Sequence, residues 1–153
     1  MGKMKKLLFS IYMALVALFC AGCEIKVEYE TIPFVVNDVY YSLLQNDKVV
    51  KGVYYSQSSF EKDFKPAIAG AGSMDKLADF ESSFVVTVTG VSSETRRSIE
   101  IVEVLKKDMT LHIKYKIIDG EKTGAKMRPC VVASISRNYT DCDIAFHDIS
   151  DWE

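Results

Sequence analysis

Four cysteines and two histidines are the residues of this chain with the most versatile chemistry, and their spacing limits what they can do. Cys20 and Cys23 stand near the N-terminus, whereas Cys130 and Cys142 stand near the C-terminus. A cysteine thiol can be acylated, form a disulfide or bind a metal ion. The two distal cysteines lack Cys-x-x-Cys spacing, and two histidines do not complete a zinc set. We therefore expect no metal site and no cofactor.

The N-terminal segment has the order of a secretory signal. Lys3, Lys5 and Lys6 precede an apolar run over residues 7–19, and the small residues Ala21 and Gly22 follow it. Charged, apolar and small-residue regions in this order are typical of a cleaved signal peptide. The run is too short to span a bilayer comfortably, because a spanning helix needs about 20 apolar residues. The sequence thus predicts a removable segment over residues 1–22.

The tetrad Cys20-Ala21-Gly22-Cys23 resembles the lipobox of bacterial lipoproteins, although Cys20 stands where an aliphatic residue is usual. The resemblance implies that Cys23 is diacylated, that the chain is cut before it and that the new amine is acylated. Two or more acyl chains give stable anchoring to a membrane. The next residue, Glu24, is not the Asp of inner-membrane retention, so we expect an envelope protein anchored in the outer membrane. The alternative is a conventional signal with an unrelated cysteine at its end.

Composition restricts the mature chain, residues 23–153, to one domain of ordinary size. Its 131 residues can bury a core without metal ions or many disulfides. The signal removes three of the 19 basic residues and no acidic one, which leaves 16 basic against 21 acidic residues and a formal net charge of −5. This acidic balance argues against nucleic-acid binding, which needs a basic surface.

Most of the mature chain predicts strand, because apolar residues recur at every second position. The clearest case has Leu111, Ile113, Tyr115 and Ile117 on one face and polar residues on the other. Such alternation is typical of a half-buried antiparallel strand. A one-residue slip of the alternation at 101–102 predicts a β-bulge. We expect a mainly β domain of about seven or eight mostly antiparallel strands and one short helix, folded as a sandwich or a curled sheet.

Local signals place the remaining elements. Two strand-like runs, 34–44 and 48–55, flank Gln45-Asn46-Asp47 and suggest a hairpin. The segment 58–61 reads Ser-Ser-Phe-Glu, a capping-box pattern that predicts a helix starting at Ser58. Asp119-Gly120 predicts a break in the chain, with a polar loop before the strand that begins after Pro129.

Two features of the folded part bear on binding or cross-linking. Cys130 and Cys142 lie in an exported chain, where they can form a disulfide or remain as two buried thiols. The paired tyrosines can either present rings to a glycan or partner, or pack one ring in the core and the other over a sheet edge. These pairs are Tyr40/Tyr41 and Tyr54/Tyr55. No nucleophile, metalloprotease or phosphate-binding motif is present, so we expect no catalytic residues and no enzyme activity.

From Tyr54 to about Phe146 the order of features resembles the C-terminal domain of PrcB-like lipoproteins, which are accessory subunits of a secreted protease complex. The matching segments are Phe60–Phe64, Asp79-Phe80, Phe84–Gly90, Ser98-Ile99-Glu100-Ile101, Leu111–Ile117 and Pro129–Ile135. The family's distinctive Thr-Gly-Gly-Tyr loop is replaced here by Ser93-Glu94-Thr95-Arg96-Arg97. The resemblance implies a β-rich fold and a partner that is a protease.

The function that we predict is binding of another protein by a non-enzymatic, lipid-anchored envelope protein. Val91 to Arg97 is expected to be a polar loop between two strands, and Arg96 and Arg97 can bind carboxylates there. A solvated connection without a partner is the alternative for this loop. A small carbohydrate- or ligand-binding module that uses the tyrosines is the second functional hypothesis. Exposed tyrosines on a concave face would favour the module, whereas an open sheet edge would favour protein binding.

Overall fold

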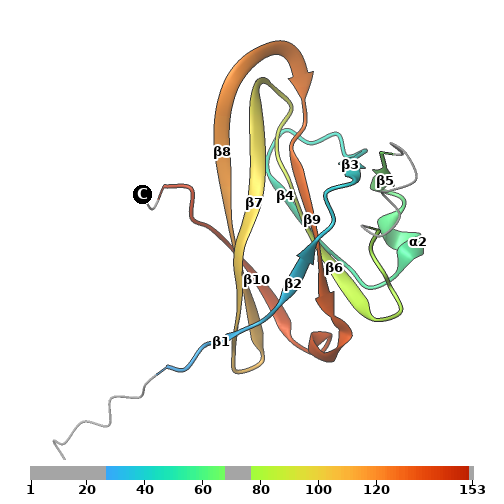
Figure 1. Cartoon of the computed structure of the whole chain (residues 1–153), viewed down its shortest axis with the longest axis vertical. Coiled ribbons are helices and arrows are strands. Elements are labelled where there is room, and N and C mark those ends of the chain that lie inside the picture. Colours follow the sequence, from blue (N-terminus) through green and yellow to red (C-terminus); the bar gives the residue numbers. More distant parts are fainter. Residues whose placement is uncertain (1–26, 68–76, 152–153) are drawn as a thin grey trace, which may run out of the picture.

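The computed structural model describes residues 27–67 and 77–151, which form a β-rich body (Figure 1). The predicted signal segment 1–22 and Cys23 lie outside the described residues. Within the described part, no helix has the length and apolar character needed to cross a membrane. The strands are β1 (Glu30–Thr31), β2 (Phe34–Val36), β3 (Tyr40–Ser42), β4 (Val50–Tyr54), β5 (Phe64–Pro66), β6 (Ser83–Thr89), β7 (Ser93–Lys107), β8 (Thr110–Met127), β9 (Cys130–Ser136) and β10 (Asp143–Asp148). The helices are α2 (Gln57–Phe60) and the 3-10 helix η2 (Arg137–Tyr139).

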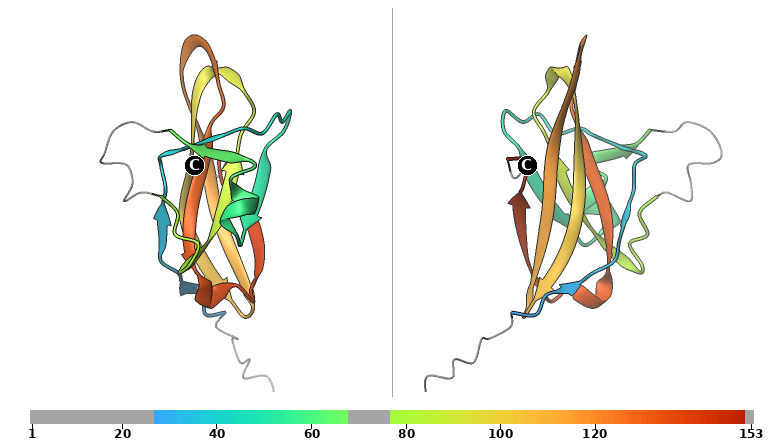
Figure 2. Two further views of the ribbon diagram at one scale, coloured as in Figure 1. Left: turned by 90° about the vertical axis from the view of Figure 1, so that its right-hand side faces the viewer. Right: turned by 60° about the vertical axis from the view of Figure 1, so that its left-hand side comes forward.

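The strands form three layers (Figure 2). The outer sheet has the order β1-β7-β8-β10, and the central sheet has the order β2-β9-β6-β4. The third layer contains the small β3-β5 sheet and α2. All strand pairs are antiparallel except β8 with β10, which is parallel. The mainly β, mostly antiparallel fold class with one short α-helix is confirmed.

Successive apolar side chains in the central sheet point to opposite faces, so both faces of this sheet are covered by other layers. In β6, Phe84 and Val86 belong to the main core with the outer sheet, whereas Val85 packs with the third layer. Every second residue of a strand faces the same side, so a continuous apolar run serves two cores. The main core is closed from the outer sheet by Ile99, Ile101, Val104, Leu111, Ile113 and Tyr115. The second core is mainly aromatic and is built around Phe60 and Phe64.

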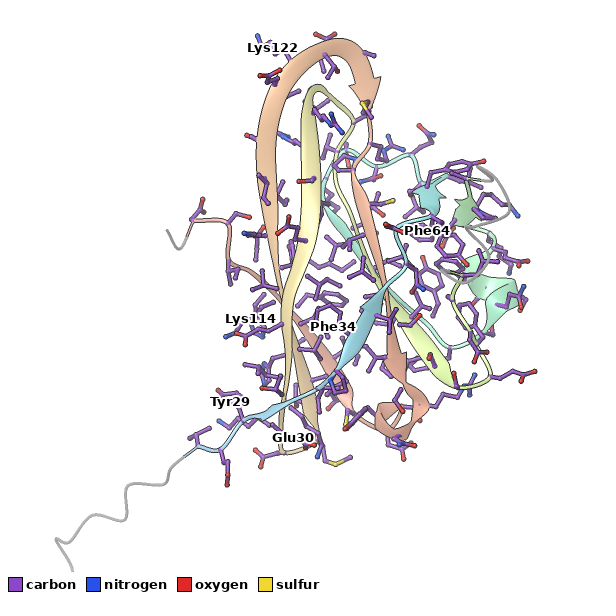
Figure 3. All side chains as sticks on the ribbon, viewed as in Figure 1. Tyr29, Glu30, Phe34, Phe64, Lys114 and Lys122 are labelled. Atoms are coloured by element: carbon purple, nitrogen blue, oxygen red, sulfur yellow. The ribbon has the colours of Figure 1, made fainter. Side chains whose placement is uncertain are left out.

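The side chains predicted to face the core in the strand over residues 111–117 of the outer sheet do so, and Leu111, Ile113 and Tyr115 are buried. Tyr115 is 1% exposed and belongs to the main core, whereas its neighbour Lys114 is only half-buried. In Figure 3 the Lys114 side chain points away from the core side of the outer sheet, on which Phe34 lies. The register between β7 and β8 shifts between Ile101 and Glu103, which is the predicted bulge.

Two local predictions are wrong. The runs 34–44 and 48–55 do not form a hairpin, because β3 pairs with β5 while β4 pairs with β6. The short helix begins earlier than the capping-box pattern indicates: Ser56 is the N-cap, and its hydroxyl accepts a hydrogen bond from the backbone N–H of Ser59. The residues Gln45–Asp47 do separate two strands, but these strands pair with other partners. The serine-rich segment does contain a helix cap, but the cap is two residues earlier than expected.

Candidate functional site

The β7–β8 hairpin continues well beyond the part that packs on the central sheet. We call its far part, residues 93–98 and 118–127, the distal arm; it forms the upper end of the molecule in Figure 1. The predicted loop at Val91–Arg97 is therefore wrong, since β7 already begins at Ser93. The predicted break at Asp119-Gly120 is also wrong, since β8 runs through to Met127.

Arg96 and Arg97 lie within the arm strand β7 rather than in a connecting loop. The Arg97 Nε atom donates a hydrogen bond to Asp119 Oδ1 across the hairpin, at 2.6 Å. Gly120 allows the two arm strands to approach closely there, because a Cβ atom at this position would lie 2.7 Å from the carbonyl oxygen of Arg96. Arg97 thus holds the arm together, whereas the exposed side chain of Arg96 has no such cross-strand role among the described contacts.

The arm is a two-stranded ribbon with two open edges. β1 pairs with β7 only at Glu30 and Thr31, near the opposite end of the hairpin. On the other side β10 follows β8 only as far as Tyr115. Beyond these points, neither edge of the hairpin has a strand neighbour among the described residues. Such unpaired edges expose backbone N–H and C=O groups that can bind another chain.

The surface of the arm is polar and has a different charge from the rest of the protein. Residues 119–127 are all exposed. The arm carries four basic and three acidic residues, a net charge of +1, so the remainder of the mature chain carries −6. Arg96, Lys122 and Lys126 present exposed cationic side chains, and Figure 3 shows Lys122 at the tip.

The paired tyrosines do not form an exposed platform. Tyr40 and Tyr54 both pack edge-on against Phe60, at ring-centroid distances of 4.9 and 5.4 Å. Tyr41 and Tyr55 are about half exposed, but they lie in different layers of the molecule. Tyr55 stacks on Phe84 of the main core rather than facing a concave surface. The packing interpretation of the tyrosine pairs is the one that the structure supports.

Hydrogen bonds fix the inner two tyrosines further. The Tyr54 hydroxyl donates to Asp63 Oδ2 at 2.8 Å, and burial together with this carboxylate raises the pKa of Tyr54. The Tyr40 hydroxyl accepts from the backbone N–H of Ala78. The cavity beside Tyr40 has a volume of about 110 Å³, whereas ligand pockets usually measure about 300–1,000 Å³. This cavity is therefore too small for a sugar ring with its hydroxyl groups.

The possible disulfide between Cys130 and Cys142 is not formed, and both residues are free thiols. Cys130 packs with the aromatic core on one face of the central sheet, while Cys142 belongs to the main core on the other face. Cys130 begins β9, whereas Cys142 follows η2 beyond the far end of that strand. At about 3.3 Å per residue, β9 alone separates them by roughly 20 Å, so no bridge can close. Burial raises the pKa of the Cys130 thiol and makes it unreactive.

A second candidate site lies on the outer face of the outer sheet, where a pocket of about 580 Å³ opens beside β10. The pocket is lined by Tyr29, Leu105, His112, Lys114, Phe146, His147, Asp148 and Ile149. His112 on β8 and His147 on β10 meet there, with His112 Nδ1 at 2.9 Å from His147 Nε2. No sequence pattern links these two histidines. Their proximity depends on a parallel strand pairing between segments about 35 residues apart, which no local pattern reveals.

The electrostatics of this pocket favour the uncharged form of His147. Burial, the neighbouring His112 and then Lys114 and Lys51 lower the pKa of His147. Lys114 itself is paired with Glu103, with its Nζ atom 2.6 Å from the Glu103 carboxylate. The edge of the Tyr29 ring faces His112 at a centroid distance of 6.0 Å and covers one side of the pair. Within the described residues, no cluster of three or more metal-ligating side chains occurs.

Comparison with known proteins adds no relative to this description. No family model matches the chain, and neither a curated protein nor a solved structure matches it. The resemblance to PrcB-like lipoproteins therefore remains a prediction from the sequence.

Proposed function

We propose that this protein is a non-enzymatic, lipid-anchored protein of the bacterial envelope that binds another protein through the distal arm. The observation that supports this most is the arm itself, a ribbon with open edges that contributes little to the core. A strand pair with open edges and a mostly exposed surface can bind a different chain by adding a strand at its edge. A protease is the class of partner that the resemblance to PrcB-like lipoproteins implies.

The direction of the arm supports the same proposal. β1, the first strand after the anchor segment, pairs with β7 at Lys106 and Leu105, next to the turn at Asp108. The arm occupies the other end of β7, and Ser93 at its far end lies about 40 Å from Leu105 at about 3.3 Å per residue. Figure 1 shows the N-terminal end of the described chain and the arm at opposite ends of the molecule. A lipid at Cys23 would therefore present the arm away from the membrane.

Charge reversal on the arm tests this function with a matched control. The arm variant combines Arg96→Glu, Lys122→Glu and Lys126→Glu. The control variant makes the same charge change at Lys48, Lys62 and Lys65, which are exposed and lie off the arm. Both variants should melt close to the wild type, because exposed substitutions usually change stability by at most about 0.5 kcal/mol each.

The measurement is recovery of cross-linked proteins from the native envelope, quantified against the wild type. The arm variant should lose at least about 90% of one specific partner, while the control variant should retain it. Equal recovery of every partner by the two variants would show that the arm is not the binding surface. If instead the control loses the partner, the contact lies on the third layer.

The anchor is tested separately by Cys23→Ser, which removes the thiol that would carry the lipid. This variant should leave the membrane fraction after salt and carbonate washes, with the melting temperature of the folded domain unchanged. Continued membrane association after both washes would contradict lipid anchoring at Cys23 but would leave the arm proposal intact.

The ligand-binding alternative is less well supported. It requires tyrosine rings that line a concave surface, and Tyr40 and Tyr54 are instead held in the aromatic core. The pocket beside the two histidines is large enough for a ligand, but none of the four paired tyrosines lines it. Titration with oligosaccharides should therefore produce no change in tyrosine fluorescence.

A further inference from the structure

The two histidines of the chain lie on neighbouring strands of the outer sheet, β8 and β10. His147 on β10 is the partner of Lys114 on β8, and His112 is two residues away on the same face of β8. Their ring centroids are 5.1 Å apart, and the nearest nitrogens, Nδ1 of His112 and Nε2 of His147, are separated by 2.9 Å. Both backbones are fixed by the sheet, so the two imidazoles are held close together without any ligand.

We propose that His112 and His147 form a two-imidazole site for a divalent late first-row transition metal ion, with Cu²⁺ bound most tightly. In the ion-free pair, one nitrogen must donate and the other accept the hydrogen bond that joins the rings. A metal ion takes the place of that shared proton and binds the lone pairs of both nitrogens. The proton of the donating nitrogen moves to the other nitrogen of the same ring, so both imidazoles remain neutral and no net proton is released.

The separation of the nitrogens matches this chemistry. Bonds from metal to imidazole nitrogen measure about 2.0–2.1 Å, so two adjacent ligands at an angle of 90–109° are separated by roughly 2.9–3.4 Å. The observed 2.9 Å lies at the lower end of this range. Binding then requires the two rings to rotate, so that their nitrogen lone pairs turn from each other toward the ion. The backbone of the sheet does not have to move.

The surroundings leave space for the remaining ligands. The pocket of about 580 Å³ lies directly beside the pair and is open to solvent, so water can complete the coordination. The charged groups around it are Lys114 on β8, Asp148 on β10, Lys51 on β4 and Lys107, whose Nζ atom lies over the Tyr29 ring. The ion pair with Glu103 offsets the charge of Lys114.

The choice of metal follows from the donors. Neutral imidazoles suit copper, nickel and zinc, and affinity for a given set of nitrogen ligands is highest for Cu²⁺. Calcium and magnesium prefer oxygen ligands and are excluded by the same reasoning. Two protein ligands and open positions make an exchangeable site rather than a structural one, since structural zinc sites usually have four protein ligands.

The experiment titrates the full chain in detergent micelles with CuCl₂, NiCl₂ and ZnCl₂ and records the electron paramagnetic resonance of bound Cu²⁺. We expect one Cu²⁺ per chain with coupling to two imidazole nitrogens. The assignment is direct, because the chain contains no histidine besides these two. His112→Gln and His147→Gln should each weaken Cu²⁺ binding at least ten-fold and leave coupling to one imidazole. Ni²⁺ should bind more weakly than Cu²⁺.

Two lysines on β8 provide a matched control for the position of the ion. Lys114→Gln removes a cation from the pocket and leaves Glu103 unpaired, so it should tighten Cu²⁺ binding several-fold. Lys116→Gln breaks a comparable pair with Glu100 outside the pocket and should have a smaller effect. Equal affinity of these two variants would contradict an ion in this pocket.

The proposal is overturned by any of three further results. These are an absence of binding at 100 µM Cu²⁺, a wild-type signal without imidazole coupling, and unchanged affinity in the single glutamine variants. Melting temperatures of the variants show whether the fold is retained. Since Arg96, Lys122 and Lys126 lie at the other end of the hairpin, the arm variant should bind Cu²⁺ like the wild type.

Discussion

The proximal half of the β7–β8 hairpin, residues 99–107 and 110–117, packs against the central sheet, whereas the distal arm does not. Both halves are formed by the same two strands, and both are antiparallel ribbons. In the proximal half Ile99, Ile101 and Ile113 are buried, while in the arm every residue from 119 to 127 is exposed. The two halves therefore share secondary structure and differ in packing.

This difference shows which forces maintain each half. Burial of apolar side chains stabilises the proximal half, at about 25 cal/mol for each Å² of apolar surface removed from water. The arm has only cross-strand hydrogen bonds and side-chain pairs such as Arg97 with Asp119, each of which contributes little. Isolated two-stranded ribbons are marginally stable. The arm stays formed because the proximal half holds its two strands side by side. The arm is therefore available to bind another chain.

The largest expected effect tests the proximal half. Tyr115→Asp should unfold the domain, because it places an unpaired carboxylate in the main core, near Asp148, at a cost of several kcal/mol. Burial and Asp148 also raise the pKa of Tyr115 to about 12, so the native side chain is uncharged. Lys114→Asp, one residue earlier, should lose the pair with Glu103 and place a like charge beside it on the half-exposed face, at a cost of about 1 kcal/mol. Thermal melting monitored by circular dichroism compares them, and equal melting temperatures would refute the assigned phase.

The second prediction concerns the aromatic core, which lies on the opposite side of the central sheet from the hairpin. Phe60→Ala should destabilise the domain by about 3–5 kcal/mol, since Phe60 is 1% exposed and contacts four other aromatic rings. Chemical denaturation gives the free energy of unfolding. Under conditions where this variant is folded, its recovery of a partner through the arm should equal that of the wild type; a selective loss would mean that the third layer contributes to binding.

A smaller and more local effect is expected in the arm. Gly120→Ala would place a Cβ atom against the Arg96 carbonyl oxygen and separate the two arm strands. The free energy of global unfolding should fall by about 1 kcal/mol, within the usual range for single substitutions. Amide hydrogen exchange should accelerate in the arm and remain unchanged in the proximal half. Glu121→Ala, at an exposed arm position next to Gly120, is the control. Faster exchange around Tyr115 in the glycine variant would show that the two halves unfold together.

The smallest expected effect is on the pH dependence of stability. The pKa of His147 is lowered in the folded protein, by burial and by His112, Lys114 and Lys51, so folding favours the neutral imidazole. This contribution is fully present above the unfolded pKa of about 6.5 and is lost as the pH falls below that value. The free energy of unfolding should decrease slightly between pH 7 and pH 5. His147→Gln should show a flatter profile over this range, and a steeper one would reverse the assigned sign.

Much of the fold is determined by local sequence patterns. Alternation in 111–117 set the strand and its buried face, and the phase slip at 101–102 located the bulge between Ile101 and Glu103. These features depend on the side-chain period of two, which is a property of the extended backbone itself. For the same reason the buried positions of Tyr115 and Ile113 were predictable without knowledge of any neighbouring strand.

Strand partners were not predictable in the same way. The sequence suggested that two adjacent strand-like runs pair across Gln45–Asp47, yet β3 and β4 pair with β5 and β6 in different sheets. The arm was read as loop because polar residues and glycine dominate it. A polar segment can remain extended when a neighbouring strand satisfies its backbone hydrogen bonds. Only the tertiary structure shows that β7 and β8 stay paired through the arm, with register shifts on both sides of Thr95.

The sequence by itself determined the mainly β character and the phase of the buried strands. It also predicts the signal and anchor at residues 1–23. Only the tertiary structure decided that Cys130 and Cys142 lie on opposite faces of one sheet. It also brought His112 and His147 together through the parallel pairing of β8 and β10. The physical reason is that periodicity acts between neighbouring residues, whereas pairing between distant strands depends on how the whole core packs.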